Sequence, residues 1–313
     1  MKRVATVGTF DGVHRGHHCV LETLRSYAGT HAMTPLVVTF RNHPLSVIAP
    51  ERAPGSLCSP EEKEAMLRQE GMEVDMETFT PDMCALSARE WIRRLRDNHN
   101  VRAIVIGYDN TFGCDGRTMK REDYIKAGKD EGVDIVVAPE IDGISSSAVR
   151  KAVEAGNLEK AAEMLGRFYT LRGKVVRGKQ LGRTIGIPTA NLLPENADAV
   201  LPPFGAYISE VRLPDMPPFR GVTNIGVRPT VDNATLPAIS IETYILDFDA
   251  DIYDAEIEVS LLHFLRREEK FSSLSDLKRQ IEKDILCARR YRALPPPLPI
   301  SANELPLRRF SKQ

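Results

Sequence analysis

The sequence lacks any long apolar run. Its first apolar run, Val4 to Val7, ends before Gly8 and Asp11 and is too short for the core of a signal peptide. No other run approaches the length that a membrane-spanning helix needs, so we expect no membrane partner. The sequence also contains no internal repeat and no long low-complexity segment. These absences favour a globular cytoplasmic protein.

Cysteine pairs and excess charge are missing as well. The cysteines are odd in number, never form a Cys-x-x-Cys pair, and stand at Cys19, Cys58, Cys84, Cys114 and Cys287. This pattern argues against a disulfide framework and a zinc site, and it is typical of reduced thiols in a cytoplasm. The 42 basic and 43 acidic residues leave a formal charge of −1. We therefore expect no nucleic acid partner, because little would release counterions from a polyanion.

The most informative stretch lies close to the start of the chain. Val4 to Val7 predict a buried strand, and an apolar-periodic helix follows that contains Val20 and Leu21. Between them runs the turn Gly8-Thr9-Phe10-Asp11-Gly12-Val13-His14-Arg15-Gly16-His17. A helix N-terminus attracts anions because its amide groups lack partners within the helix. The absence of a side chain at Gly16 would let a phosphate approach the backbone closely.

His14 and His17 are three residues apart, so both rings are expected to project to one side of the first helical turn. Two imidazole donors would then face the same phosphate. This arrangement suits a reaction at the α-phosphate of a nucleotide, whose transition state spreads negative charge over phosphoryl oxygens and a leaving pyrophosphate. The alternative for such a histidine pair is an ordinary polar loop.

Strands alternate with helices over residues 1–150, which predicts a parallel, doubly wound α/β sheet. Helices that cover this sheet are expected to begin after Ser59 and Ser87, where a serine precedes a glutamate by three residues. The further strands are expected at 35–40, 101–106 and 135–138.

Polar residues follow the expected strands of this sheet. His43 comes after the second strand, at the carboxyl edge where ligands bind in such sheets, and is a candidate substrate contact. Ser146 and Ser147 can cap a helix or bind phosphate with their hydroxyl and amide groups. Arg150, in the first turns of that helix, can bind the same phosphate through its guanidinium.

Beyond Gly166 the pattern of the chain changes. Short β-branched or aromatic runs, separated by Gly, Pro, Asn and Asp, predict a small antiparallel barrel. An amphipathic helix from Ser273 to Ala288 is expected to close it. We therefore expect one domain at 1–165, a second at 166–290, and a tail at 291–313 to which the sequence assigns no role.

The segment Gly173 to Asn191 is the most specific part of the second domain. Gly178 and Gly182 could fold a loop over phosphates, although the Gly-Lys-Ser/Thr of a P-loop is absent. Thr189 and Asn191 alternate on an expected strand, so two neutral oxygens would share one face and could bind a hard cation. Such a cation must draw most of its binding from substrate phosphates.

Glu242 is an isolated carboxylate between two apolar runs of another expected strand. From the pattern alone it is equally an outward-facing strand residue or a proton acceptor.

The turn that contains His14 and His17 resembles the signature of the HxGH nucleotidyltransferases, and its flanks resemble the adenylyltransferase half of the bacterial bifunctional riboflavin kinase/FAD synthetase family. That family has a Gly-x-Asp/Asn-Phe-x-Phe-Gly loop, similar to residues 107–113 here, and an Ile-Ser-Ser-Thr-x-x-Arg segment, similar to residues 144–150. Asn110 departs from this pattern, because an aromatic residue is usual there.

The resemblance implies roles for individual residues of the first domain. His14 and His17 would hold the charge of the transition state, and Arg150 would neutralise the leaving pyrophosphate. Contacts to nucleotide or flavin are implied at Gly8, Phe10, Asp11, Gly16, His43, Asp109, Phe112, Gly113, Ser146 and Ser147.

The second domain resembles the riboflavin kinase signature through Pro188-Thr189-Ala190-Asn191 and Ile241-Glu242-Thr243. The resemblance implies that Thr189 and Asn191 bind Mg²⁺ and that Glu242 activates the 5′-hydroxyl of riboflavin. Further contacts to nucleotide or flavin are implied at Gly178, Gly182, Arg183, Tyr253 and Arg266.

The resemblance covers about residues 4–287 and implies a bifunctional enzyme. The barrel would phosphorylate riboflavin with ATP to give FMN, and the first domain would adenylate FMN to FAD, both with Mg²⁺. Two alternatives stay open: a protein in which only the kinase works, because of Asn110, and a flavin- or nucleotide-sensing module without turnover. The oligomeric state is also open.

Overall fold

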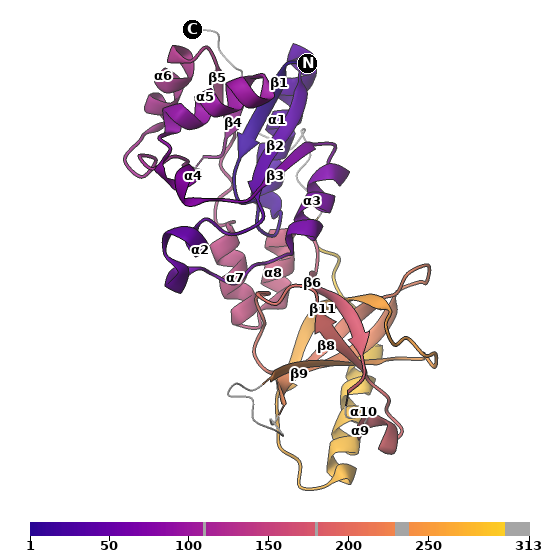
Figure 1. Cartoon of the computed structure of the whole chain (residues 1–313). Coiled ribbons are helices and arrows are strands. Elements are labelled where there is room, and N and C mark those ends of the chain that lie inside the picture. Colours follow the sequence, from indigo (N-terminus) through magenta and orange to yellow (C-terminus); the bar gives the residue numbers. More distant parts are fainter. Residues whose placement is uncertain (109–110, 179–180, 229–237, 298–313) are drawn as a thin grey trace. The chain divides into compact units, whose positions relative to one another are not determined.

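The computed structural model describes residues 1–108, 111–178, 181–228 and 238–297 (Figure 1). Contacts between residues divide the described chain into two units, Met1–Ser146 and Ser147–Pro297. From the sequence we expect the division after residue 165, and the two helices between these points are α7 (Ser146–Glu154) and α8 (Leu158–Leu165). In the described part of the chain, no helix is long and apolar enough to cross a membrane.

The first unit is built on a five-stranded sheet with the strand order β3-β2-β1-β4-β5. Every neighbouring pair is parallel, and Val and Ile dominate its central strands because both faces are covered. The strands are β1 (Arg3–Val7), β2 (Thr34–Phe40), β3 (Glu73–Glu77), β4 (Val101–Ile106) and β5 (Asp134–Val137).

Helices cover both faces of this sheet. On one face Val4 and Val37 pack in a core with side chains of α1 and α3, and on the other Ala5 and Val38 pack with α5 and α6. The doubly wound fold expected from the sequence is therefore confirmed. The helices of this unit are α1 (Arg15–His31), α2 (Leu45–Ile48), the 3₁₀ turn η1 (Pro50–Arg52), α3 (Pro60–Gln69), α4 (Pro81–Ala85), α5 (Ala88–His99) and α6 (Arg121–Asp130).

The two helix starts expected from capping patterns are present. Ser59 caps α3, where its hydroxyl accepts from Glu62 N at 3.1 Å and the Glu62 carboxylate accepts from Ser59 N at 2.7 Å. Ser87 and Glu90 form the same reciprocal pair at α5. These contacts satisfy amide groups that have no partner within the helix.

The sequence does not predict strand β3, because its alternating residues are acidic rather than apolar. Glu73, Asp75 and Glu77 share one face of the strand, as residues two apart must. Each of the three forms an ion pair with a basic side chain: Arg3 at 2.8 Å, His99 at 3.1 Å and Arg94 at 2.8 Å, respectively. Ion pairs therefore take the place of an apolar face at this edge of the sheet.

The second unit is a closed barrel with the strand order β10-β7-β6-β11-β8-β9, in which every pair is antiparallel. The barrel expected from the sequence is therefore confirmed. Its strands are β6 (Tyr169–Val176), β7 (Ala190–Pro194), β8 (Gly205–Arg212), β9 (Phe219–Arg228), β10 (Ala238–Ile245) and β11 (Glu256–Arg267).

Two helices accompany the barrel, the short α9 (Leu181–Thr184) and the long α10 (Leu274–Arg290). Ile285 and Ala288 of α10 pack in one apolar core with Ile208 and Leu262 of the strands. The sequence predicts this helix from its apolar residues three or four apart, and the structure confirms it.

Glu131 joins α5 to the end of α6 in the first unit. Its side chain is only 5% exposed, and its carboxylate accepts hydrogen bonds from Arg89 at 2.6 Å, Arg93 at 2.9 Å and Arg96 at 2.8 Å. Hydrogen bonds from Arg93 and Arg89 lower the pKa of Glu131 from 4.5 to about 2. A carboxylate whose pKa is lowered by folding stabilises the folded state above its unfolded pKa, and this contribution disappears as the pH falls through the folded pKa.

We expect Glu131→Gln to lower the thermal midpoint of the first unit by about 5 °C or more at pH 7, because three arginines lose their shared counter-ion. The difference from the wild type should shrink as the pH falls from about 4.5 towards about 2. The fluorescence of Trp91 reports on this unit alone, since it is the single tryptophan and is buried in its core.

Asp130→Asn is the matched control, because this neighbouring carboxylate is 45% exposed and lies 3.9 Å from Arg89. An equal loss in both variants, or a difference that does not change with pH, would contradict this role of Glu131.

Candidate active sites

The turn between β1 and α1 has an unusual backbone. Phe10 and Val13 have positive φ angles of 47° and 34°, and Gly12 has one of 75°. Only glycine adopts such angles freely, so the two larger residues are held there against their preference. Strained backbone of this kind concentrates at functional sites, where the surrounding structure fixes it.

His14 and His17 form a reciprocal cap at the N-terminus of α1. His17 N donates to His14 Nδ1 and His14 N donates to His17 Nδ1, both at 3.3 Å. Because a ring nitrogen that accepts an N–H carries no proton, each neutral ring keeps its proton on Nε2. The rings stack with centroids 3.6 Å apart and planes 14° apart. The structure thus brings the two rings together at the start of α1.

Gly16 leaves room for this histidine pair. A Cβ atom at this position would lie 3.1 Å from both Cε1 and Nδ1 of the His14 ring. Such a distance is shorter than ordinary van der Waals contact, so His14 would have to move. The absence of a side chain at Gly16 therefore leaves room for the His14 ring and keeps the backbone accessible.

Asp11 ties this turn to other segments of the first unit. Its Oδ1 accepts from Leu57 N at 2.9 Å, and its carbonyl oxygen accepts from Ser146 Oγ at 3.0 Å. Gly8, at the end of β1, donates its N–H to Val38 O at 3.2 Å. The carboxylate of Asp11 thus positions the turn itself.

The expected phosphate-binding residues beyond the turn lie in α7. Ser146 and Ser147 are its first residues, and Arg150 follows in the first turns with only 8% of its surface exposed. A buried guanidinium at this place has few conformations to lose on binding an anion.

His43 follows β2, and its Nδ1 accepts from Leu45 N at 3.1 Å at the start of α2. Its ring orientation is therefore fixed by the protein backbone.

Phe112 and Gly113 are bound into the first unit. Phe112 is buried against the ring of Tyr124, with centroids 5.0 Å apart, and the Tyr124 hydroxyl bonds to its backbone. Gly113 has a φ of 92°, and a Cβ atom there would lie 2.3 Å from Ala88 N. Asp109 and Asn110, also singled out from the sequence, lie outside the described residues.

A cavity of about 350 Å³ lies beside Phe112, at the carboxyl end of β4. The guanidinium carbon of Arg121 lies 3.7 Å from the ring centroid of Tyr108, and both side chains line this cavity with Ile106, Thr111 and Met119. The Arg121 guanidinium therefore covers one face of the Tyr108 ring in a cation–π contact. Sequence reasoning did not single out these two residues.

Three oxygen-bearing side chains meet in the barrel. The Thr189 hydroxyl lies 3.5 Å from Glu242 Oε2, and Asn191 stands directly opposite Glu242 in the register of β7 and β10. Thr189 immediately precedes β7, and Asn191 is only 5% exposed. A hydroxyl oxygen and a carboxamide oxygen are suitable ligands for Mg²⁺. A carboxylate beside them can accept a proton.

Glycines allow this part of the barrel to close tightly. A Cβ atom at Gly178 would lie 2.5 Å from the carboxamide of Asn191, and one at Gly182 would lie 2.2 Å from Ile187 O. The absence of side chains at Gly178 and Gly182 therefore lets the chain pack closely beside the candidate metal ligands.

A cavity of about 410 Å³ opens beside these residues and is lined by Arg183, Thr189, Thr243 and Tyr253 among others. The guanidinium carbons of Arg177 and Arg183 lie 4.7 and 5.7 Å from the ring centroid of Tyr253. The lining of this cavity also includes Asp249 and Asp251, so acidic and basic side chains meet there.

A row of buried hydroxyl groups extends from the cavity into the barrel. Thr243 Oγ1 lies 2.9 Å from Thr223 Oγ1, which donates to Ser209 Oγ at 2.8 Å, and all three residues are fully buried. Sequence reasoning missed this row, although Thr243 directly follows Glu242.

Arg266 has a structural partner in the second unit. Its Nε and Nη2 donate to Asp284 Oδ2 of α10 at 3.0 and 2.8 Å, and Asp284 is 4% exposed. The guanidinium thereby fastens α10 to β11. The contact to flavin expected at Arg266 stays a prediction.

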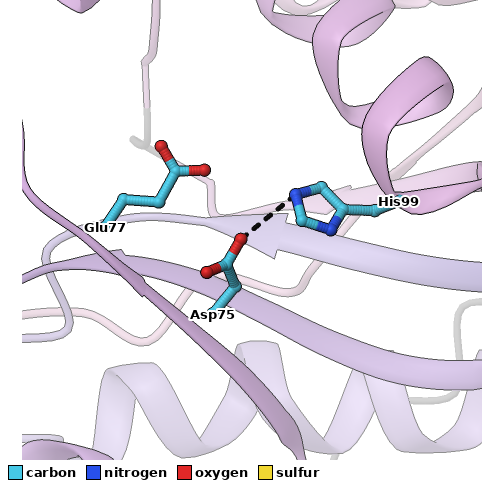
Figure 2. Close-up of side chains that lie close together, drawn as sticks. All are labelled: Asp75, Glu77 and His99. Atoms are coloured by element: carbon cyan, nitrogen blue, oxygen red, sulfur yellow. Dashed lines mark ion pairs between the residues drawn. The ribbon is translucent and has the colours of Figure 1, made fainter.

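Among the described residues, one group of histidine and acidic side chains could share a metal ion: Asp75, Glu77 and His99 (Figure 2). Figure 2 shows the ion pair between His99 and Asp75, and Glu77 is paired with Arg94. Arg94 pairs with Glu77 and the His99 ring contacts Asp75, so we assign the group to the stability of β3.

Both parts of the chain match known families. Residues 1–150 match the model of the FAD synthetase family, and residues 165–292 match that of the riboflavin kinase family. A solved structure described as a macrolide-efflux protein from Streptococcus pneumoniae has a TM-score of 0.83 and 29% identity to this chain, and the match covers 93% of this chain and 95% of that one.

Curated relatives match over nearly the full length. The bifunctional riboflavin kinase/FMN adenylyltransferase of Escherichia coli K12 is 37% identical over 300 residues, which cover 94% of each chain. The protein of that name from Bacillus subtilis is 36% identical over 294 residues, covering 93% of this chain and 92% of the relative. This chain therefore belongs to the family of bifunctional riboflavin kinase/FMN adenylyltransferases.

Proposed function

We propose that this chain carries out two successive reactions of flavin synthesis. It phosphorylates riboflavin with ATP to give FMN and ADP, and it adenylates FMN with a second ATP to give FAD and pyrophosphate. We assign the adenylyltransferase to residues 1–165 and the kinase to residues 166–290, with 291–313 as a tail. The observation that carries the proposal is that each unit has its own set of reactive groups, the stacked histidines in one and Thr189, Asn191 and Glu242 in the other.

In the adenylyltransferase, a phosphate oxygen of FMN attacks the α-phosphorus of ATP in line, and the bond to pyrophosphate breaks. His14 and His17 donate their Nε2 protons as hydrogen bonds to the phosphoryl oxygens, and Arg150 neutralises the leaving pyrophosphate. The tautomers fixed by the reciprocal cap support these roles for the histidines. No covalent intermediate with the protein is needed.

In the kinase, Glu242 accepts the proton of the riboflavin 5′-hydroxyl while the oxygen attacks the γ-phosphorus of ATP. Thr189 and Asn191 would hold Mg²⁺, which would neutralise charge on the phosphates. Their neutral oxygen donors fit this hard cation. Arg183 and Tyr253 would contact the nucleotide or flavin from the wall of the cavity.

We include a cytoplasmic location in the proposal, because none of the cysteines forms a disulfide in the structure. All five are free thiols, and two of them are buried.

Incubation of the protein with riboflavin, ATP and Mg²⁺ tests the proposal directly. We expect FMN to form first and FAD to follow, as seen by chromatographic separation of the flavins. FMN that accumulates without FAD would leave only the kinase active. If neither product forms although riboflavin binds, the protein is a sensing module and the proposal fails.

Two substitutions should separate the reactions. We expect Glu242→Gln to lower FMN formation at least about 100-fold, because the proton acceptor is lost, while FAD synthesis from supplied FMN continues. His17→Ala should do the reverse, with a loss of about 100-fold in FAD synthesis. Steady-state rates of both reactions check this. If either substitution abolished both activities in a folded protein, one reaction could not be assigned to each domain.

We expect Mg²⁺ to bind the nucleotide-free protein weakly, with a Kd of about 1 mM or above, because its two protein ligands are uncharged. Calorimetric titration of the metal into the free protein measures this affinity. Asn191→Ala should raise the Mg²⁺ concentration needed for half-maximal FMN formation and leave that for FAD formation unchanged. Tight binding without nucleotide would show that other groups hold the metal.

A further inference from the structure

Lys63 is a buried cation next to the turn between β1 and α1. It lies in α3 and is 7% exposed. Its Nζ donates to Thr9 O at 3.0 Å and to Phe40 O at 2.5 Å. Thr9 belongs to the turn and Phe40 is the last residue of β2, so one ammonium group joins the carboxyl ends of two neighbouring strands.

Other contacts already attach this turn to the segment before α3. Leu57 N donates to Asp11 Oδ1 at 2.9 Å, and Gly12 N donates to Cys58 Sγ at 3.2 Å. The turn therefore does not depend on a lysine for its attachment alone.

Burial of the Lys63 ammonium group carries a desolvation cost. Within the described chain, no acidic side chain forms an ion pair with its ammonium group. Burial lowers the pKa of Lys63, while the charges of Cys58, Asp11 and Glu61 act in the opposite direction. A neutral amide side chain could donate to the same two carbonyl groups with a smaller desolvation penalty. The positive charge therefore calls for an explanation beyond hydrogen bonding.

An anion at this turn would provide that explanation. The carboxyl ends of parallel strands present carbonyl oxygens, and their negative partial charges repel a phosphate. Lys63 binds two of these oxygens and adds positive charge close to the N-terminus of α1, which itself favours anions.

We propose that Lys63 is a positioning residue of the adenylyltransferase site, whose charge holds the Thr9 and Phe40 carbonyl groups and favours the ATP phosphates at the β1–α1 turn. This inference rests on the proposed function, because it takes the turn as the place where the triphosphate binds. Lys63 acts through the electrostatic potential of the turn and transfers no proton.

Two substitutions separate its charge from its hydrogen bonds. Lys63→Met removes both, whereas Lys63→Gln keeps donors and removes the charge. In FAD synthesis from supplied FMN, we expect the KM for ATP to rise about 10-fold in both variants while the KM for FMN stays within about twofold. A turn that had merely lost its shape would change kcat and both KM values.

The same chain provides the controls. Riboflavin kinase activity, which belongs to the other unit, should stay unchanged, and Trp91 fluorescence should show that the first unit is folded at the assay temperature. Lys126→Met is the matched surface variant, because this lysine is exposed on α6 of the same unit, and it should keep the wild-type KM for ATP.

Several results would overturn the proposal. A wild-type KM for ATP in Lys63→Gln would mean that the hydrogen bonds to Thr9 and Phe40 are enough for ATP binding and that the charge is not needed. A wild-type KM for ATP in Lys63→Met would mean that Lys63 has no role in ATP binding. If both variants leave the first unit unfolded, Lys63 serves stability alone and the proposal fails. An equal rise in Lys126→Met would point to a general effect of charge. Failure of the wild type to form FAD would instead refute the proposed function.

Discussion

Two backbone hydrogen bonds at the start of α1 decide what the first site can do. The amides of His14 and His17 each donate to Nδ1 of the other ring, and the His17 amide also donates to His14 O at 2.8 Å. The same contacts fix the ring orientations, stack the rings and leave the remaining proton of each on Nε2. Paired donors at a helix N-terminus are suited to an anionic transition state, because they need no reorganisation during the reaction.

The two candidate sites are held in place by different means. The first is a strained loop, in which positive φ angles at residues such as Phe10 cost of order 1–3 kcal/mol each. Contacts from Leu57, Lys63 and Ser146 hold this loop from three segments of the chain. The second site depends on strand register, since a shift of one residue between β7 and β10 would turn Asn191 away from Glu242.

Patterns in the sequence predict most of the fold, because buried strands and capped helices depend on neighbouring residues. They do not predict β3, whose acidic residue Glu73 is balanced by Arg3, 70 residues away in the chain. The same limit applies to the sites. Motif spacing predicts that His14 and His17 gather, but it cannot reveal that Arg266 is already bound to Asp284 or that the buried Lys63 reaches the first turn, because those partners come together only through the fold.

The protonation of the two histidines in the ligand-free protein tests the central claim most directly. Long-range ¹H–¹⁵N correlation spectra of the ¹⁵N-labelled protein near pH 7.5, assigned with single histidine variants, distinguish the two ring nitrogens. The account predicts that His14 and His17 are both neutral, with the proton on Nε2 and Nδ1 unprotonated. A proton on Nδ1 of either ring would contradict the reciprocal cap and the phosphate-facing donors that follow from it.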